Sequence, residues 1–305
     1  MIIRKKEHWF RMLFVWHGSV LPGLVPRLIL LFLLSLSIVY FHGFIFSFKI
    51  PMNPAPLTLF GFVLALFLGF KNNVSYERFW EGRKLWGNLL NVSRSLTRQA
   101  LTLKNKKNGE IIINEFIGLM SSFVFALKHE LRGTDAYADL KDRLSDSNLQ
   151  RVAIAKYKPS VILLLMAECV QKAKDEGSLD SIQQARFDRN FDELAHIVGG
   201  CERIISTPIP YSYKILLHRT VYTYCFLLPF GLVDSLGWLT PFIVAFIAYT
   251  FVAFEAIADE IEEPFGTEAN DLALNSMCNT IEDTIHELAG EKIPNAQKIT
   301  KNIID

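Results

Sequence analysis

Few side chains in this sequence are spaced for catalysis or for binding a metal. The four cysteines, Cys169, Cys201, Cys225 and Cys278, lie far apart, a spacing that predicts reduced thiols rather than a redox or zinc site. The seven histidines form no HxxxH or HExxH pattern, and neither a Walker-type phosphate loop nor a GxSxG motif occurs. We therefore expect a protein that is not an enzyme and that uses no metal or cofactor.

Oxygen ligands gather in one place, around the break Pro264-Phe265-Gly266. Glu263 precedes this break, and Glu268 and Asp271 follow it. Loops rich in carboxylate oxygens can bind calcium. Acidic residues at this position can equally cap the N-terminus of a following helix. The residues alone leave both interpretations open.

An apolar stripe is the other arrangement with a physical consequence. Phe62, Leu66 and Phe70 recur at intervals of four and so share one face of a helix. Such a face can contact lipid or another helix. If identical helices surround an axis, each residue forms a ring, and stacked apolar rings can close a pore to ions by dewetting. Gly61 and Gly69 would allow close helix approach.

The stripe belongs to a chain with long uncharged stretches. Two of these stretches, Leu28–Phe48 and Pro51–Phe70, contain no Asp, Glu, Lys or Arg, and Lys49 lies between them. A third, Thr220–Phe254, contains one charged residue, Asp234. About 20 apolar residues cross a bilayer core, so the first two stretches predict one span each. The third predicts a hairpin that turns at Asp234–Gly237. Buried helices of a soluble protein are the alternative.

The remaining segments predict a helical cytosolic domain and no strand of useful length. Ile111–Leu127 and Val161–Val170 are apolar but contain polar residues, as core helices do. Ser75–Ser95 and Ser181–Ile205 show helical spacing. Loops are predicted at Lys104–Gly109 and Gly133–Ser147. Two prolines after Thr207 are expected to end the helix over Ser181–Ile205.

Charge placement predicts the topology. The 32 Lys and Arg nearly balance the 31 Asp and Glu, which disfavours nucleic acid as a partner. Of the basic residues only Lys49 falls in an outer loop, so both termini are expected in the cytoplasm. His8–Trp16 is expected to form an interfacial or docked helix that ends at Gly18.

The expected fold is therefore all-α, a polytopic membrane protein with four transmembrane helices and a helical cytosolic domain. Its expected segments are an N-terminal interfacial or cytosolic part (1–27), a first transmembrane hairpin (28–70), a cytosolic domain (71–214), a second hairpin (215–258) and a C-terminal cytosolic helix and tail (259–305).

Four segments, in this order along the chain, resemble the bestrophin family and its bacterial members in particular. They are Arg11–Val20, Phe67–Gly87, Gly199–Tyr213 and Ile261–Asn275. The resemblance implies a homopentamer around a central pore. It also implies that Phe62, Leu66 and Phe70 form the hydrophobic neck and that Ile182 forms a cytosolic aperture, with Leu179 as the alternative.

The resemblance also bears on calcium. Animal members hold calcium in a clasp of consecutive acids after the Pro-Phe-Gly turn, whereas here the run keeps only Glu268 and Asp271, with Glu263 before it. We expect a remnant of the clasp and no calcium gating.

The leading hypothesis is a passive channel for monovalent ions in the bacterial inner membrane, with itself and membrane lipids as partners. Glu176 and Asp180 near the aperture favour cations, whereas Lys71 below the neck favours anions. We favour cations, with a chloride channel like those of animal bestrophins as the alternative.

Two other classes of function remain. One is a non-conducting scaffold or sensor. The other is a coupled transporter, which is disfavoured because only His42 and Asp234 are ionisable within or beside the spans.

Overall fold

The computed structural model describes residues 8–12, 15–16, 18–41, 44–45, 48–49, 52–103 and 109–291. These residues are helical almost throughout and divide into two compact units. We call the described residues up to Phe79, together with Pro208–Glu263, the membrane unit. Trp80–Thr207 and the described residues from Pro264 onward form the core unit.

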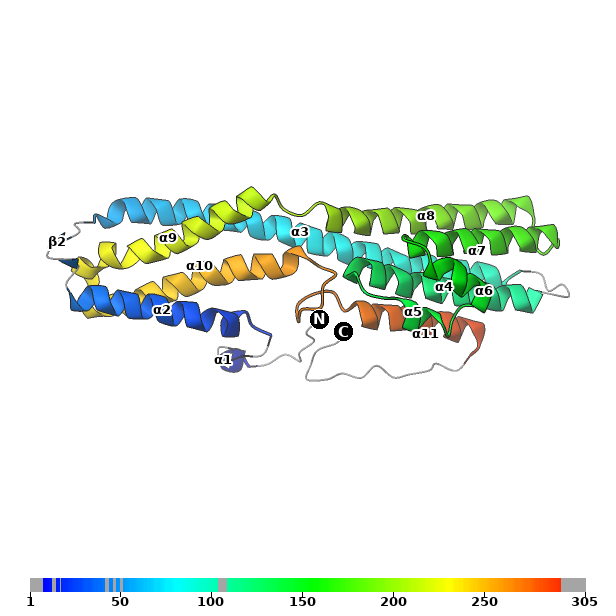
Figure 1. Ribbon diagram of the computed structural model, residues 1–305, viewed down its shortest axis with the longest axis horizontal. Helices are drawn as coiled ribbons and strands as arrows, with labels where there is room; N and C mark the ends of the chain where they lie inside the picture. The colour runs from blue at the N-terminus through cyan, green and yellow to red at the C-terminus, as the bar shows by residue number, and fades with distance from the viewer. Residues whose placement is uncertain are drawn as a thin grey trace. The chain divides into compact units, whose positions relative to one another are not determined.

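The membrane unit consists of apolar helices that pack side by side. In chain order its elements are α1 (Trp9–Met12), α2 (Leu21–Tyr40), β1 (Phe44–Ile45), β2 (Phe48–Lys49), the first part of α3 (Pro54–Leu101), α9 (Tyr211–Leu236), the 3₁₀ turn η1 (Gly237–Leu239) and α10 (Thr240–Glu262). Figure 1 shows α2 and α9 beside α10. The short strands β1 and β2 pair antiparallel. Leu64 and Leu68 of α3 join Val221, Val244 and Ala248 in the buried core.

Three segments of the described chain are long and apolar enough to cross a membrane: Leu21–Tyr40, Pro54–Leu101 and Tyr211–Glu262. The third contains α9 and α10, which are about 39 and 35 Å long at 1.5 Å per residue. The predicted pair of helices is confirmed, but the turn lies at Gly237–Leu239 rather than at Asp234–Gly237, because α9 continues to Leu236. Gly237 adopts a φ of 51°, which favours glycine.

Helix α3 continues well past the apolar stripe. It spans 48 residues, about 72 Å, and crosses the expected segment boundary at Phe70 without a break. No proline occurs between Lys71 and Leu101, so nothing in the sequence ends the helix there. The same helix therefore contributes to both units.

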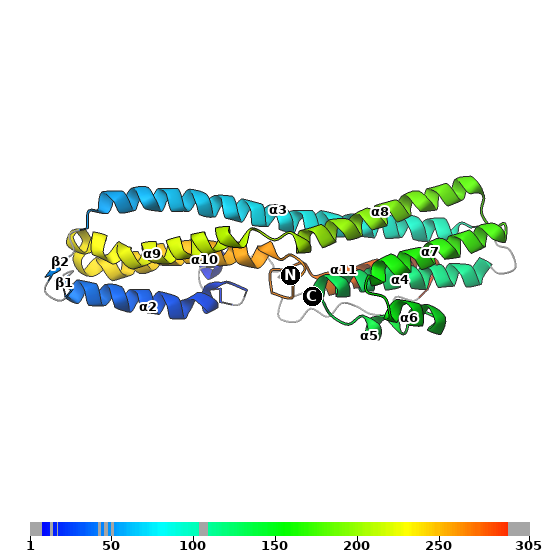
Figure 2. The ribbon, with the colours of Figure 1, turned by 45° about the horizontal axis from the view of Figure 1, so that its top comes forward.

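The core unit adds α4 (Gly109–Arg132), α5 (Tyr137–Leu140), α6 (Asp146–Ala153), α7 (Lys158–Asp175), α8 (Ser181–Ser206) and α11 (Leu274–Ala289) to the second part of α3. Figure 2 shows the short helices α5 and α6 next to α4 and α7. Met120 and Phe123 of α4, Met166 of α7 and Leu194 of α8 are completely buried. The expected core helices are thus confirmed.

Two helices end next to prolines as expected, and two other segments differ from the prediction. Helix α8 ends at Ser206, just before Thr207-Pro208, and α10 ends at Glu262, just before Pro264. Where the structure describes His8–Trp16, it is helical over Trp9–Met12 (α1) and not at Val15 and Trp16, and the expected loop at Gly133–Ser147 contains α5. The expected loop at Lys104–Gly109 falls, up to residue 108, outside the described residues.

Candidate functional site

The stripe on α3 is exposed in the protomer. Phe62, Leu66 and Phe70 have exposed fractions of 63%, 48% and 61%. Leu59, Val63 and Phe67 are exposed beside them, so the open arc of α3 is wider than three residues. The opposite face of the helix is buried through Leu64 and Leu68. The three stripe residues are therefore held at a surface that the described residues of the membrane unit leave open.

Close packing against α9 fixes the direction in which the stripe points. A Cβ atom on Gly61 would lie 2.5 Å from Tyr224 Oη, and one on Gly231 would lie 2.4 Å from Leu57 Cδ1. Both glycines thus permit contacts that any side chain would prevent. Because α3 is held to α9 along this seam, its other face is turned outward.

Lys71, directly after the stripe, does not add a free positive charge. Its side chain is buried, and its Nζ lies 2.7 Å from Asp259 Oδ1. Lys214 Nζ lies 3.2 Å from the same oxygen. The expectation that Lys71 would favour anions below the neck is therefore corrected, since its charge is paired inside the protomer. The sequence did not show this because Asp259 is 188 residues away.

The aperture candidate lies at the first turn of α8, in the core unit. Ile182 is 70% exposed, whereas Leu179 is 6% exposed and belongs to the core. Asp180 is the N-cap residue. Its Oδ1 accepts a hydrogen bond from Gln183 N (2.7 Å), and Gln183 Oε1 accepts one from Asp180 N (3.0 Å). This capping box fixes the start of α8 and thus the position of Ile182.

The acidic residues near Pro264 make a turn. Asp271 is buried and its Oδ2 accepts a hydrogen bond from Glu268 N at 2.8 Å, while Leu272 N donates to Pro264 O at 3.0 Å. Glu263 is exposed at the end of α10. Among the residues that the structure describes, no group of three or more His, Cys, Asp or Glu is arranged to hold a metal ion.

The membrane unit contains an ionisable pair that the sequence analysis overlooked. Glu255 of α10 is buried, and its Oε1 lies 2.9 Å from Nδ1 of His218 on α9. The statement that only His42 and Asp234 are ionisable near the spans is therefore corrected. Asp234 is exposed in the last turn of α9, and His42 lies outside the described residues.

A second polar pair lies in the core unit. Burial and then the negative charge of Glu202 raise the pKa of Glu130 to about 7, while Lys158 acts in the opposite direction. Neither oxygen of Glu130 is reached by solvent. Glu130 and Glu202 come from α4 and α8, so no sequence spacing links them.

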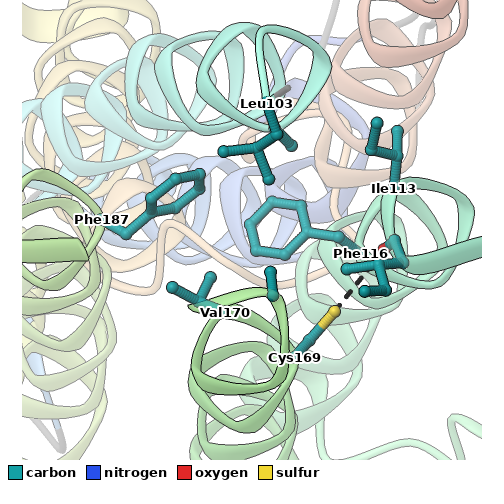
Figure 3. Close-up of a pocket in the computed structure, with 9 residues that line it drawn as sticks. Leu103, Ile113, Phe116, Cys169, Val170 and Phe187 are labelled. Atoms are coloured by element: carbon teal, nitrogen blue, oxygen red, sulfur yellow. Dashed lines mark hydrogen bonds between the residues drawn. The ribbon is translucent and has the colours of Figure 1, made fainter. Parts of the chain in front are cut away.

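The small cavity of the core unit offers no chemistry. Figure 3 shows Phe116, Phe187, Leu103 and Val170 turned toward it, beside Cys169. Its free volume is about 10 Å³, which is room for about one water molecule. Cys169 Sγ donates to the carbonyl oxygen of Ile112 (3.5 Å), and burial raises the pKa of this thiol to about 12. We interpret the cavity as a packing defect of an apolar core.

Comparison with known proteins gives a consistent result. The chain matches the family model of bacterial/fungal bestrophin proteins over residues 1–287. It is 49% identical over 291 residues to a voltage-dependent anion channel-forming protein of Ralstonia nicotianae, with 95% of each chain covered. It is 40% identical over 291 residues to the voltage-dependent anion channel-forming protein YneE of Escherichia coli K12, again with 95% of each chain covered.

The fold agrees with these matches. The crystal structure of a bacterial bestrophin homologue from Klebsiella pneumoniae has a TM-score of 0.84 to this chain and is 39% identical to it. The match covers 88% of this chain and 99% of the other.

Proposed function

Because the chain belongs to the bacterial/fungal bestrophin family, we propose that it is a passive ion channel in which copies of α3 surround a central pore. The observation that carries the proposal is the exposed stripe of Phe62, Leu66 and Phe70, held outward on a helix whose other face is buried. The resemblance implies five copies. The four spans would then be α2, the first part of α3, α9 and α10.

The stripe gives such a pore a hydrophobic neck. Each of its residues would contribute one apolar side chain per subunit, and the residues recur about 6 Å apart along the helix, forming three stacked rings. Apolar rings bind water weakly, so a narrow neck can empty of water and stop ions without a plug. We propose that Ile182 forms a separate ring in the core unit, the cytosolic aperture.

We propose that the permeant ions are monovalent and that cations are favoured. Lys71 is buried and paired with Asp259, so its ammonium group does not face the region below the neck. Glu176 and Asp180 place carboxylates next to Ile182 in the sequence. The second candidate is an anion channel, which is supported by the names of the relatives from Ralstonia and Escherichia.

The location follows from the basic residues. With α2, α3, α9 and α10 as spans, only Lys49 falls in an outer loop, which supports cytoplasmic N- and C-termini in a bacterial inner membrane. Membrane lipids and further copies of the chain are then its partners. Glu263, Glu268 and Asp271 are proposed to be a structural remnant of a calcium clasp that needs no bound ion.

Flux through liposomes tests the proposal. Purified protein should release sodium or chloride down a gradient, and its mass should correspond to a homopentamer. The triple change of Phe62, Leu66 and Phe70 to alanine should raise the flux several-fold, because a wider and less apolar neck stays wet. The matched control changes Phe246 and Phe254, which are exposed on α10, to alanine.

The outcomes separate the alternatives. Unchanged flux in the triple variant would reject the neck, and an equal effect of the control would reject its location on α3. A correctly assembled protein that conducts neither ion would favour the non-conducting scaffold or sensor. Flux that requires a second solute gradient would favour a coupled transporter, in which case the buried Glu255 and its partner His218 become the first residues to test.

A further inference from the structure

Glu77 lies on the same face of α3 as the apolar stripe. It follows Phe70 by seven residues, and at 100° per residue this places the two side chains within about 20° of each other around the helix. The rise of 1.5 Å per residue separates them by about 10 Å along the axis. Glu77 is exposed, as Phe62, Leu66 and Phe70 are. The stripe therefore continues from three apolar residues to a carboxylate.

The two basic residues of α3 within the membrane unit, Lys71 and Arg78, contact groups other than Glu77. Lys71 is buried against Asp259, and Arg78 points to a different face, where its Nε donates to the backbone oxygen of Glu262 at 3.0 Å. Asn72 and Asn73, between the stripe and Glu77, are neutral. Within the described part of the chain, Glu77 itself takes part in no ion pair. Its negative charge is thus uncompensated within the membrane unit.

We propose that Glu77 is the specificity-determining residue of the channel, forming a ring of carboxylates that selects cations at the cytosolic end of the neck. This inference rests on the proposed function, because only an oligomer with α3 around the axis brings the copies together. Rings of Asp or Glu are a common source of cation selectivity in channels. The apolar neck carries no formal charge, so a charged ring next to it decides which ion enters.

The distances are suited to this role. A ring about 10 Å from the last apolar residue is little more than one Debye length away, since that length is about 8 Å at physiological salt. Its field therefore still reaches ions that leave or enter the neck. Several carboxylates in a low-dielectric wall raise the local cation concentration and lower that of anions. The effect should weaken as the salt concentration rises, because the same field is screened.

Reversal potentials across a bilayer with a sodium chloride gradient test the assignment. We expect a sodium-to-chloride permeability ratio above one for the unmodified protein. Glu77→Gln should lower the ratio several-fold, Glu77→Lys should invert it, and Glu77→Asp should retain it because the charge is kept. Glu287→Gln is the matched control, since it removes one exposed helical carboxylate from α11 in the core unit and should leave the ratio unchanged.

Failure of this inference is distinguishable from failure of the proposed function. If the Gln and Lys variants conduct with the same permeability ratio as the unmodified protein, the role of Glu77 is overturned and the channel proposal stands. An unmodified channel that prefers chloride would also overturn it. If the assembled protein conducts nothing, the channel proposal fails and this inference fails with it. A single elution profile for all variants shows that each has folded.

Discussion

The membrane unit and the core unit both contain long apolar helices, but they bury them differently. In α4 of the core unit, every residue from 119 to 127 is buried, including Ser121 and Ser122. In the stripe region of α3, only Leu57, Gly61, Leu64 and Leu68 are buried. The protomer therefore buries residues 119–127 of α4 completely and leaves most of the stripe region of α3 exposed. The polar residues within Ile111–Leu127 indicated a core helix in the sequence, and the number of neighbours around each helix shows the difference directly.

The largest expected difference between the units is in the free energy of unfolding lost when one phenylalanine in each is changed to alanine. Phe123→Ala should lower the free energy of unfolding by about 3 to 5 kcal/mol, because it leaves a cavity in the closely packed core unit. Phe246→Ala removes a phenyl ring that is exposed on α10 and should cost less than about 1 kcal/mol in detergent micelles. Denaturant unfolding followed by circular dichroism measures both. Equal costs would mean that Phe246 is buried between subunits, and the contrast drawn above would then fail.

For ion pairs, the larger loss of stability should occur in the membrane unit and the smaller one in the core unit. In the membrane unit, Asp259→Asn leaves the buried ammonium of Lys71 without its closest carboxylate and should cost about 2 to 3 kcal/mol. In the core unit, the Arg151–Glu168 pair is exposed on both sides, so Arg151→Ala should have no measurable effect. Adding Lys71→Met to Asp259→Asn should restore most of the lost stability, because the buried charge is gone. If the double variant is no more stable than Asp259→Asn, burial of Lys71 is not the cause.

The elements that could be predicted are those with local signals. Pro208, Pro264 and Gly237 end helices through the backbone itself, so their positions were readable from the sequence. The unbroken course of α3 was harder, because a change from apolar to polar residues at Lys71 resembles the end of a span although no residue there stops a helix. A change from apolar to polar residues indicates that the surroundings of the helix change, but it does not indicate that the helix ends.

The features of the candidate site also differ in whether a local sequence signal predicts them. The stripe of Phe62, Leu66 and Phe70 was visible because its spacing is local, and a step of seven residues from Phe70 along the same helical face reaches Glu77. The pairs Lys71–Asp259, His218–Glu255 and Glu130–Glu202 each join separate helices. Their partners depend on tertiary packing, so no periodicity in one sequence could indicate them.

Glycine contacts test how closely the core unit is packed. A Cβ atom on Gly118 would lie 2.5 Å from the backbone oxygen of Arg143, which cannot rotate away. Gly118→Ala should therefore cost about 1 to 3 kcal/mol. Gly199→Ala, on an open face of α8 where no atom lies within 4 Å, should instead stabilise the helix by up to about 1 kcal/mol. Thermal unfolding distinguishes them, and a stabilised Gly118→Ala variant would show that α4 can shift.

The smallest expected effect is a pH dependence confined to the core unit. Glu130 has a pKa of about 7 in the folded protein, against 4.5 for an ordinary glutamate, because it is buried next to Glu202. The folded state thus keeps a proton that the unfolded state releases between these two values. The free energy of unfolding should therefore fall as the pH rises from about 4.5 to 7 and be insensitive to this group above that range. Although its oxygens are covered, Glu130 as a whole is only half-buried, so nearby solvent reduces the penalty and the fall should be about 1 to 2 kcal/mol.

Glu130→Gln isolates this contribution, because other groups titrate in the same range. The glutamine keeps the shape of the protonated acid, so the variant should match the original protein near pH 5 and exceed its stability near pH 8. Hydrogen exchange of α4 amides at both pH values reports the core unit directly. Glu287→Gln, on an exposed face of α11, should leave the pH dependence unchanged. A pH dependence that survives in Glu130→Gln would assign it to another group and remove the reason to treat this carboxyl pair as the proton-sensitive element of the core unit.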